Sequence, residues 1–227
     1  MLNIINRFFV KMQRYVQGIP AGSANLYEKI AARFLSPIYR NITEEVCKNI
    51  NEKSNMLEIG CGTGKLLIEI LKKMEVKNII GLDISSAMIK ISRKNLVKNN
   101  MYELADLVLA DAHKIPLRNM CINLIISTGT LHHIRKPEKM FVECNRILKN
   151  GGEAWIYEFS HDAPKSDLVK FANILKKPKY ILRILSAMHG LPRQTYEKGY
   201  IKNSLAEAEV KYRIEYIGVL TKLVLMR

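Results

Sequence analysis

The sequence predicts an α/β fold in which a mostly parallel sheet carries helices on both faces. Five short apolar segments between residues 56 and 159 alternate with helical segments, which indicates βαβ units. The apolar segments are almost continuously hydrophobic, which is typical of strands covered on both faces. Near the C-terminus, two further strand-like segments follow each other too closely for a helix to lie between them.

The strands and helices of the repeating part can be assigned along the chain. Runs rich in β-branched and apolar residues predict five strands, at residues 56–59, 78–82, 106–110, 123–127 and 154–159. Helical patterns predict three helices between them, at residues 66–74, 87–99 and 137–149.

The two ends of the chain differ from this repeat. After a helical segment around Ile201–Glu209, residues 211–218 and 221–226 predict two strands that pair antiparallel, since too few residues join them for a crossover. At the other end, the apolar residues of segment 2–16 recur at steps of three and four, as on one face of a helix. Residues 24–50 predict one or two further helices, broken near Ser36–Pro37 because proline disfavours helix at the residue before it.

These assignments predict one main domain with helical additions. We expect residues 1–50 to form an N-terminal helical lid and residues 51–227 to form the main domain. Residues 161–200 are expected to form a second helical lid, inserted in that domain, with Pro178 splitting it into two helices. Both lids are amphipathic and basic, and we expect them to choose the substrate.

Composition limits the classes of protein that fit. A chain of 227 residues, 48% of them hydrophobic, is long enough for one domain with a sizeable core. The four cysteines include no Cys-x-x-Cys pair, which argues against a zinc site and a disulfide framework. No apolar run approaches the ~20 residues of a membrane span. Charges also interrupt the N-terminus too often for a signal peptide, so we expect a cytoplasmic protein.

The formal net charge of +15 leaves the partner open. Such a charge attracts RNA, an anionic membrane surface or a phosphorylated substrate. Contact with the periphery of a membrane is therefore one option, since basic amphipathic helices lie readily on anionic lipid. Solvation of an ordinary surface by Lys and Arg explains the charge equally well, because no basic motif interleaved with aromatic residues stands out.

The richest local signal is the glycine loop Gly60–Gly64, directly after a strand and before a helix. Glycines are needed where the backbone turns sharply and a ligand lies against it. Such a loop is expected to present free backbone N–H groups to a carboxylate or phosphate. A dinucleotide fingerprint needs glycine at position 65, where Lys65 stands, and a P-loop needs glycine at 59 and Ser or Thr at 66, where Ile59 and Leu66 stand.

Acidic residues follow the next two strands. Asp83 ends the second strand about twenty residues beyond the loop, where a carboxylate can accept hydrogen bonds from two ribose hydroxyls; as the alternative, it caps the following helix. Asp111 follows the third strand, so the carboxyl ends of three strands carry matching polar features in order.

The pattern Glu58-x-Gly60-x-Gly62-x-Gly64 resembles the S-adenosylmethionine loop of class I methyltransferases. The resemblance continues through residues 124–127, 131–133 and 146–152, and covers roughly residues 25–160. Residues 155–160 and 27–31 are similar to the ubiquinone/menaquinone-biosynthesis C-methyltransferases, of the methyltransferase type 11 group. Two departures are Asn123, where many relatives have aspartate, and residues 161–200, which lack the characteristic stretch of the quinone enzymes.

The resemblance implies a Rossmann-like sheet of seven strands, S-adenosylmethionine as cofactor and S-adenosylhomocysteine as product. In the family, an acid at the place of Asp111 accepts the adenine amine, and Ile84 and Met88 would sandwich the ring. Tyr27 would cover the sulfonium through its π face, or else belong to the core. The cofactor residues it implies are Tyr27, Glu58, Gly60, Cys61, Gly62, Gly64, Asp83, Ile84, Met88, Asp111, Ala112 and Ser127.

Methyl transfer from a sulfonium is an in-line displacement, so aligning the acceptor is the protein's main task and no universal catalytic residue is required. If a base is needed, His132 and His133 are the candidates, because they follow the fourth strand at the carboxyl edge of the sheet. As the alternative, they form a turn. Glu158 and His161, at the end of the fifth strand, are candidates for contact with the acceptor.

We therefore expect methyl transfer to a small acceptor, with a hydrophobic one as an option. An RNA methyltransferase that uses the basic surface is the alternative, and a non-catalytic protein that binds the cofactor is a second one. The sequence leaves open whether carbon, oxygen or nitrogen is methylated, and whether the chain is a monomer or a dimer.

Overall fold

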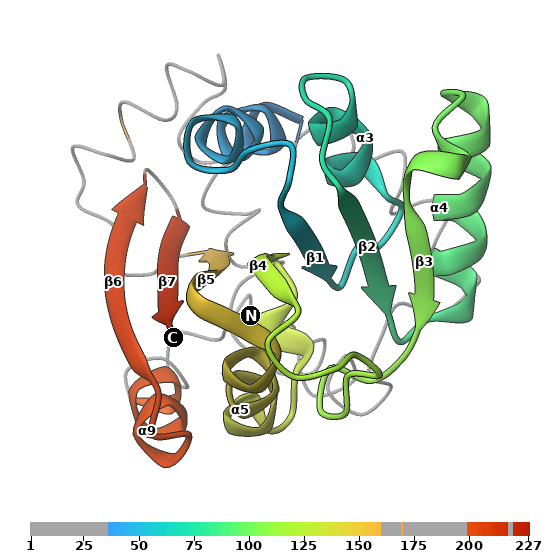
Figure 1. Ribbon diagram of the computed structural model, residues 1–227. Coiled ribbons are helices and arrows are strands. Elements are labelled where there is room, and N and C mark those ends of the chain that lie inside the picture. Colours follow the sequence, from blue (N-terminus) through green and yellow to red (C-terminus); the bar gives the residue numbers. More distant parts are fainter. Residues whose placement is uncertain (1–35, 160–168, 170–198, 218–219) are drawn as a thin grey trace.

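The computed structural model describes residues 36–159, 169, 199–217 and 220–227 (Figure 1). The predicted helix at 2–16, Tyr27, His161 and nearly all of the predicted lid at 161–200 lie outside these residues. Residues 36–49 are helical. The elements that follow are β1 (Asn55–Ile59), α3 (Lys65–Leu71), β2 (Asn78–Asp83), α4 (Ser86–Lys98), η1 (Tyr102–Leu104), β3 (Asp106–Leu109), β4 (Ile122–Thr128), η2 (Leu131–His133), α5 (Pro137–Ile147), β5 (Leu148–Phe159), α9 (Tyr200–Glu207), β6 (Lys211–Ile217) and β7 (Leu220–Met226).

The strands form one seven-stranded sheet in the order β3-β2-β1-β4-β5-β7-β6. Strands β1 to β5 pair in parallel, whereas β7 pairs antiparallel with both β5 and β6. This confirms the predicted parallel sheet with an antiparallel C-terminal hairpin. The strand order reverses between β1 and β4, and such a switch point leaves a crevice at the carboxyl ends of the strands.

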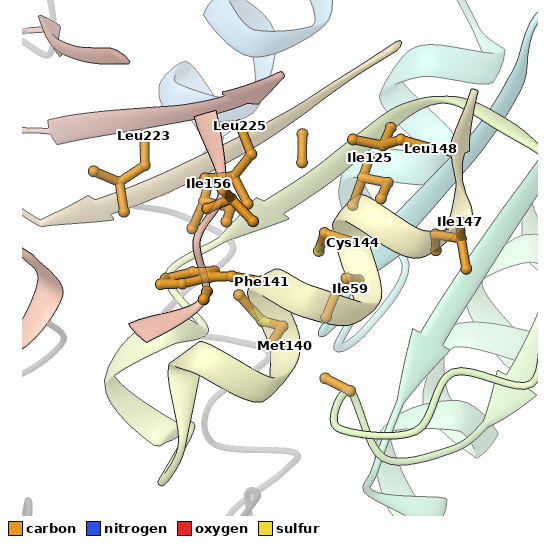
Figure 2. Packing of buried hydrophobic residues seen from close by; sticks show 14 of the residues in the cluster. Ile59, Ile125, Met140, Phe141, Cys144, Ile147, Leu148, Ile156, Leu223 and Leu225 are labelled. Atoms are coloured by element: carbon orange, nitrogen blue, oxygen red, sulfur yellow. The ribbon is translucent and has the colours of Figure 1, made fainter. Parts of the chain in front are cut away.

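Helices cover both faces of the sheet, as predicted (Figure 1). One core contains residues of the helix at 36–49, α3 and α4, and the other contains residues of α5 and α9. Figure 2 shows the second core, where Met140, Phe141 and Cys144 of α5 lie against Ile125 of β4 and Ile156 of β5. Neighbouring strand residues enter opposite cores, as Leu124 and Ile125 do, because side chains alternate along a strand.

The helix at 36–49 belongs to the body of the domain. Ile38, Ile42 and Val46 lie in the first core, each at most 3% exposed. From the same helix, Glu45 binds the buried ammonium of Lys222 on β7 and accepts a hydrogen bond of 2.9 Å from the Tyr157 hydroxyl on β5. This part of the predicted N-terminal lid is therefore packed against the sheet.

Strand β5 begins six residues earlier than predicted. Its first residue, Leu148, pairs with Ile122, and the register then shifts so that Leu124 pairs with Glu153. Glycines allow the irregular strand: Gly151 has a φ of +75°, and a Cβ on Gly152 would lie 2.9 Å from the carbonyl oxygen of Asn123. The asparagine noted as a departure from the family has a structural task here, since its Oδ1 accepts from Asn55 N–H and Lys149 Nζ.

Within the described ranges, no helix has the length and apolar character needed to cross a bilayer.

Candidate functional site

The candidate site lies at the carboxyl ends of β1, β2 and β4. Ile59, which ends β1, pairs with Leu82 of β2 on one side and with Ser127 of β4 on the other. The glycine loop leaves β1 at this point and enters α3. The sheet therefore brings the loop and the ends of β2 and β4 together.

Each glycine of the loop has a positive φ: +72° at Gly60, +52° at Gly62 and +74° at Gly64. Two of them are also closely packed. A Cβ on Gly60 would lie 2.2 Å from Oγ1 of Thr130, and a Cβ on Gly64 would lie 2.3 Å from Oγ of Ser92. At Gly62, in contrast, the nearest described atom would be 4.0 Å away, so this glycine faces open space. Gly62 is thus the position at which a ligand can approach the backbone.

The expectation of free backbone N–H groups was wrong for most of the loop. The N–H groups of Gly60 and Cys61 both donate to the carbonyl of Leu82, at 2.7 and 3.0 Å, and that of Gly64 donates to Cys61 at 2.9 Å. The Gly62 N–H donates to Oδ2 of Asp83 at 2.8 Å. The loop uses these groups to attach itself to β2, because a tight turn beside a strand end satisfies its own donors. What it offers a ligand is close approach.

Asp83 joins the loop to the helix that follows β2. Its Oδ2 accepts from Gly62 N–H, and its Oδ1 accepts from Ser85 N–H at 2.8 Å. Ser85 rather than Asp83 is the N-cap of α4, since its side chain accepts from Met88 N–H. Burial raises the pKa of Asp83, and the backbone N–H groups of Ser85, Gly62 and Ile84 partly offset this. A carboxylate has about four acceptor positions, so Asp83 can still accept two ribose hydroxyls.

Three buried oxygens beside the loop have no hydrogen-bond partner among the described residues: Glu58 Oε2, Ser127 Oγ and Thr128 Oγ1. Glu58 is only 5% exposed, and burial raises its pKa well above the ordinary value, with the nearby charge of Asp83 adding to the rise. Buried carboxylates normally have partners. A cationic amino group together with further donors would satisfy this set, and the amino-acid end of S-adenosylmethionine carries an ammonium. The residues present therefore fit the cofactor.

The side chain of Cys61 contributes nothing to that end of the site. It lies in the first core, near Leu67 and Gly81, and burial raises the pKa of its thiol. Cys61 serves the loop through its backbone only.

Asp111 stands two residues beyond β3, on a loop that is held firmly. Its side chain is 43% exposed. Glu143 of α5 accepts from Ile115 N–H at 2.7 Å, and Arg146 donates to the carbonyls of Ile115 and Leu117. The guanidinium of Arg146 also lowers the pKa of Glu143 by hydrogen bonding. The position of Asp111 is thus fixed by a network rather than left to a free loop.

The apolar residues expected around an adenine ring differ in how far they are exposed to solvent. Ile84 is 40% exposed, an unusual state for isoleucine, and it offers a face to a ring. Ala112 and Met88 are buried, at 5% and 1%, and Met88 belongs to the packed side of α4.

The two histidines have different surroundings. His132 is 1% exposed, and its Nδ1 lies 3.1 Å from Oε2 of Glu158, which is also buried. Glu158 accepts in addition from the backbone N–H groups of His132 and Phe159, both at 3.0 Å. Because the carboxylate only accepts, Nδ1 carries the hydrogen and Nε2 is left as an acceptor. His133 is partly exposed, with its ring centroid 4.0 Å from that of His132.

The sequence did not predict three residues that contact the glycine loop or Asp111. Thr130 and Ser92 pack against the loop glycines and belong to distant segments, so no local pattern announces them. The ring Nδ1 of His113 lies 2.7 Å from Oδ1 of Asp111, and the spacing Asp-x-His offers a local signal for this contact. No group of three or more His, Cys, Asp or Glu side chains suited to a metal occurs in the ranges that the structure covers.

Comparison with known proteins decides the family. The model of a methyltransferase domain matches residues 57–156, which include the loop, Asp83, Asp111 and both histidines. A structure from Methanococcus maripaludis, solved as that of a proposed S-adenosyl-L-methionine-dependent methyltransferase, superposes with a TM-score of 0.72 at 25% identity and covers 91% of this chain and 93% of its own. Residues 57–156 are therefore a methyltransferase domain, and the fold is that of the class I S-adenosylmethionine-dependent methyltransferases.

Among curated proteins, the chain is similar in part to enzymes of the UbiE type. The ubiquinone/menaquinone biosynthesis C-methyltransferase UbiE of Ruegeria sp. is 26% identical over 119 residues, which is 52% of this chain and 47% of that protein. An uncharacterized protein of Methanocaldococcus jannaschii is 31% identical over 173 residues, 70% of this chain and 63% of its own. The chain thus spans about half the length of its UbiE relative.

Proposed function

We propose that this protein is a methyltransferase that transfers the methyl group of S-adenosylmethionine to a small acceptor molecule. The observation that carries the proposal is the set of polar atoms at the switch point that the described chain leaves unpartnered, above all Glu58 Oε2, beside the open face of Gly62. Protein interiors rarely leave such atoms without partners, so they support a ligand with a cationic amino-acid end.

Each residue has a separate task in holding that ligand. Gly62 admits the ligand to the backbone, and Glu58 faces its ammonium. Asp83 accepts the ribose hydroxyls while it holds the loop to β2. Asp111 accepts the adenine amine, and Ile84 covers one side of the ring. Bound S-adenosylmethionine supplies the electrophilic methyl group, and the protein's remaining work is to align the acceptor behind it and keep water out.

The acceptor side adds a candidate base. For an acceptor that must lose a proton, we assign proton uptake to Nε2 of His132, which is buried and without a partner among the described residues. Glu158 positions the ring by accepting from Nδ1. His133, which lies beside it, is the more exposed alternative.

The placement of basic residues supports a small molecule over RNA. Six Lys and Arg residues flank the amino edge of the sheet, opposite the cofactor edge: Lys53, Lys77, Arg118, Lys149, Lys211 and Arg227. Two of the segments that form the site, residues 55–64 and 122–134, contain neither Lys nor Arg, and the cations next to the site stand just after its loops, at Lys65, Lys114, Arg135 and Lys136. An RNA backbone bound by the six cations would lie a strand length away from the methyl group.

The experiment that tests this proposal measures which class of molecule receives the radiolabelled methyl group. The chain is incubated with radiolabelled S-adenosylmethionine and a cell extract, which is then separated into lipid-soluble, aqueous small-molecule, protein and RNA fractions. We expect label in a small-molecule fraction and none with the Asp83→Ala variant. Label in RNA instead would overturn the acceptor class, and failure of the folded chain to bind S-adenosylhomocysteine in calorimetry would overturn the cofactor assignment.

A further inference from the structure

A histidine two residues after Asp111 holds that carboxylate from one side. Oδ1 of Asp111 accepts from the backbone N–H of His113 at 2.9 Å and lies 2.7 Å from its ring Nδ1. Because an ionised carboxylate has no hydrogen to donate, Nδ1 is the donor. One oxygen of Asp111 is therefore bound twice by the same residue, and this sets the direction of the other.

The second oxygen of Asp111 faces away from this pair. Within the part of the chain that the structure describes, no partner binds Oδ2, and the Asp111 side chain is 43% exposed, against 17% for His113. The surrounding loop does not need His113 for its position, because Glu143 and Arg146 tie it to α5 at Ile115 and Leu117. His113 thus controls the orientation of one side chain rather than the path of the loop.

We propose that His113 is a positioning residue that sets the base selectivity of the nucleoside site. By holding Oδ1, it directs Oδ2 at the exocyclic amine of an adenine and against a purine with a carbonyl in that place. The inference rests on the proposed function, since it needs an adenosyl group at the ends of β2 and β3. A carboxylate attracts an N–H donor and repels a carbonyl oxygen, and a site built around such a hydrogen bond rejects the analogue that lacks the donor.

Selectivity depends on the fixed orientation. A carboxylate free to rotate can turn away from a carbonyl, and it must lose its freedom when it binds an amine. Freezing one flexible side chain corresponds to about a three- to tenfold change in affinity. Losing the ring donor leaves the backbone N–H of His113 on Oδ1, so it should lower the selectivity ratio by about threefold, the lower end of that range.

The experiment compares two nucleosides and two variants. Dissociation constants for S-adenosylhomocysteine and for S-inosylhomocysteine, which carries the carbonyl, are measured by calorimetry on the full chain. His113→Phe keeps a ring and removes the donor, whereas His113→Asn places an amide N–H near the position of Nδ1. We expect the adenosine-to-inosine preference to fall about threefold in His113→Phe, where only the backbone N–H still holds Oδ1, and to stay near wild type in His113→Asn.

Asp111→Asn separates this inference from the assignment beneath it. An unchanged preference in Asp111→Asn would overturn the adenine contact itself and with it the role of His113. A preference that collapses in Asp111→Asn but is untouched in His113→Phe would overturn the role of His113 alone. Equal weakening of both nucleosides by His113→Phe, with a matching fall in thermal stability, would show a merely structural residue and also overturn it.

Discussion

The cofactor half and the acceptor half of the site handle their polar groups in opposite ways. The cofactor half comprises the carboxyl ends of β1, β2 and β3, with Glu58, Asp83 and Asp111, and each of these carboxylates keeps acceptor capacity that the described chain does not use. The acceptor half comprises the ends of β4 and β5. There, Glu158 is sealed from solvent and receives three N–H groups from His132 and Phe159.

The difference shows what each half is built to do. Unused, partly desolvated oxygens favour an external partner, so the cofactor half is complete only with a ligand. A carboxylate whose hydrogen-bond donors all come from its own chain stabilises the structure and needs no ligand. Selection of the acceptor is then a task for other segments, and the predicted lids outside the described residues stay our prediction for it.

The largest loss of stability should come from removing the buried carboxylate of Glu158 in the acceptor half. Glu158→Ala leaves three N–H donors without their buried acceptor, and we expect it to lower the free energy of unfolding by about 3–5 kcal/mol, since each unsatisfied buried donor costs about 1–3 kcal/mol. Chemical denaturation measures it. Glu158→Gln, which keeps shape and one acceptor oxygen, should cost less. A loss below about 1 kcal/mol in Glu158→Ala would show that this half is not sealed by Glu158.

Alanine substitutions at Gly60 and Gly62 separate the effect of tight packing on stability from the effect of ligand approach on binding. Gly60→Ala combines a positive φ with a Cβ 2.2 Å from Thr130, so we expect about 2–4 kcal/mol of destabilisation. Gly62→Ala has a positive φ but open space, so it should cost about 1–2 kcal/mol of stability and impair binding of S-adenosylhomocysteine far more. Thermal unfolding and calorimetry on both variants check this. Normal affinity in Gly62→Ala would place the ligand elsewhere.

The Asp83→Ala variant tests whether the unused hydrogen-bond acceptor positions of Asp83 bind the ribose hydroxyls. Removing two hydrogen bonds to a charged group should weaken binding of S-adenosylhomocysteine about 100-fold, measured by calorimetry. Since Asp83 also holds Gly62 and Ser85, Asp83→Asn serves as a control that retains size. Unchanged affinity in both variants contradicts the ribose assignment.

Two glutamates should respond to pH in opposite directions. The pKa of Glu58 is raised by burial, so the folded state prefers its neutral form and loses stability as pH rises through the native pKa. Glu58→Gln should therefore be more stable than wild type at pH 7, by about 1 kcal/mol, and bind the cofactor more weakly. The pKa of Glu143 is lowered by Arg146, so its stabilisation is present above the unfolded pKa and lost as pH falls through the native one.

Glu143→Gln should accordingly be less stable than wild type at pH 7, by about 1 kcal/mol. Both differences should shrink toward pH 3. Thermal unfolding of wild type and the two variants across this range measures the signs. A Glu58→Gln variant that is destabilised at pH 7 would show that the backbone hydrogen bond from Leu67 outweighs the cost of burying the charge of Glu58.

The elements and the positions of the acids in the cofactor half were largely predictable because they depend on local patterns, and the contacts of these acids with the cofactor stay a prediction. A strand, the glycine loop, and acids directly after the next two strands can be recognised from neighbouring residues alone, and the short link between the last two strands forces antiparallel pairing. The lengthened β5 was not predicted, since its start depends on Gly152 lying against Asn123 of the neighbouring strand.

By itself, the sequence determined the strands and helices, the C-terminal hairpin, the glycine loop and the places of Glu58, Asp83 and Asp111 at strand ends, because these follow from local patterns, whereas the strand order came from the structure. Only the tertiary structure decided that Glu45 binds Lys222 and Tyr157, that Thr130 closes on Gly60, and that Glu158 rather than solvent holds His132. These contacts join residues far apart in the chain, and their formation depends on strand register and on the shape of the packed core, which no local pattern encodes.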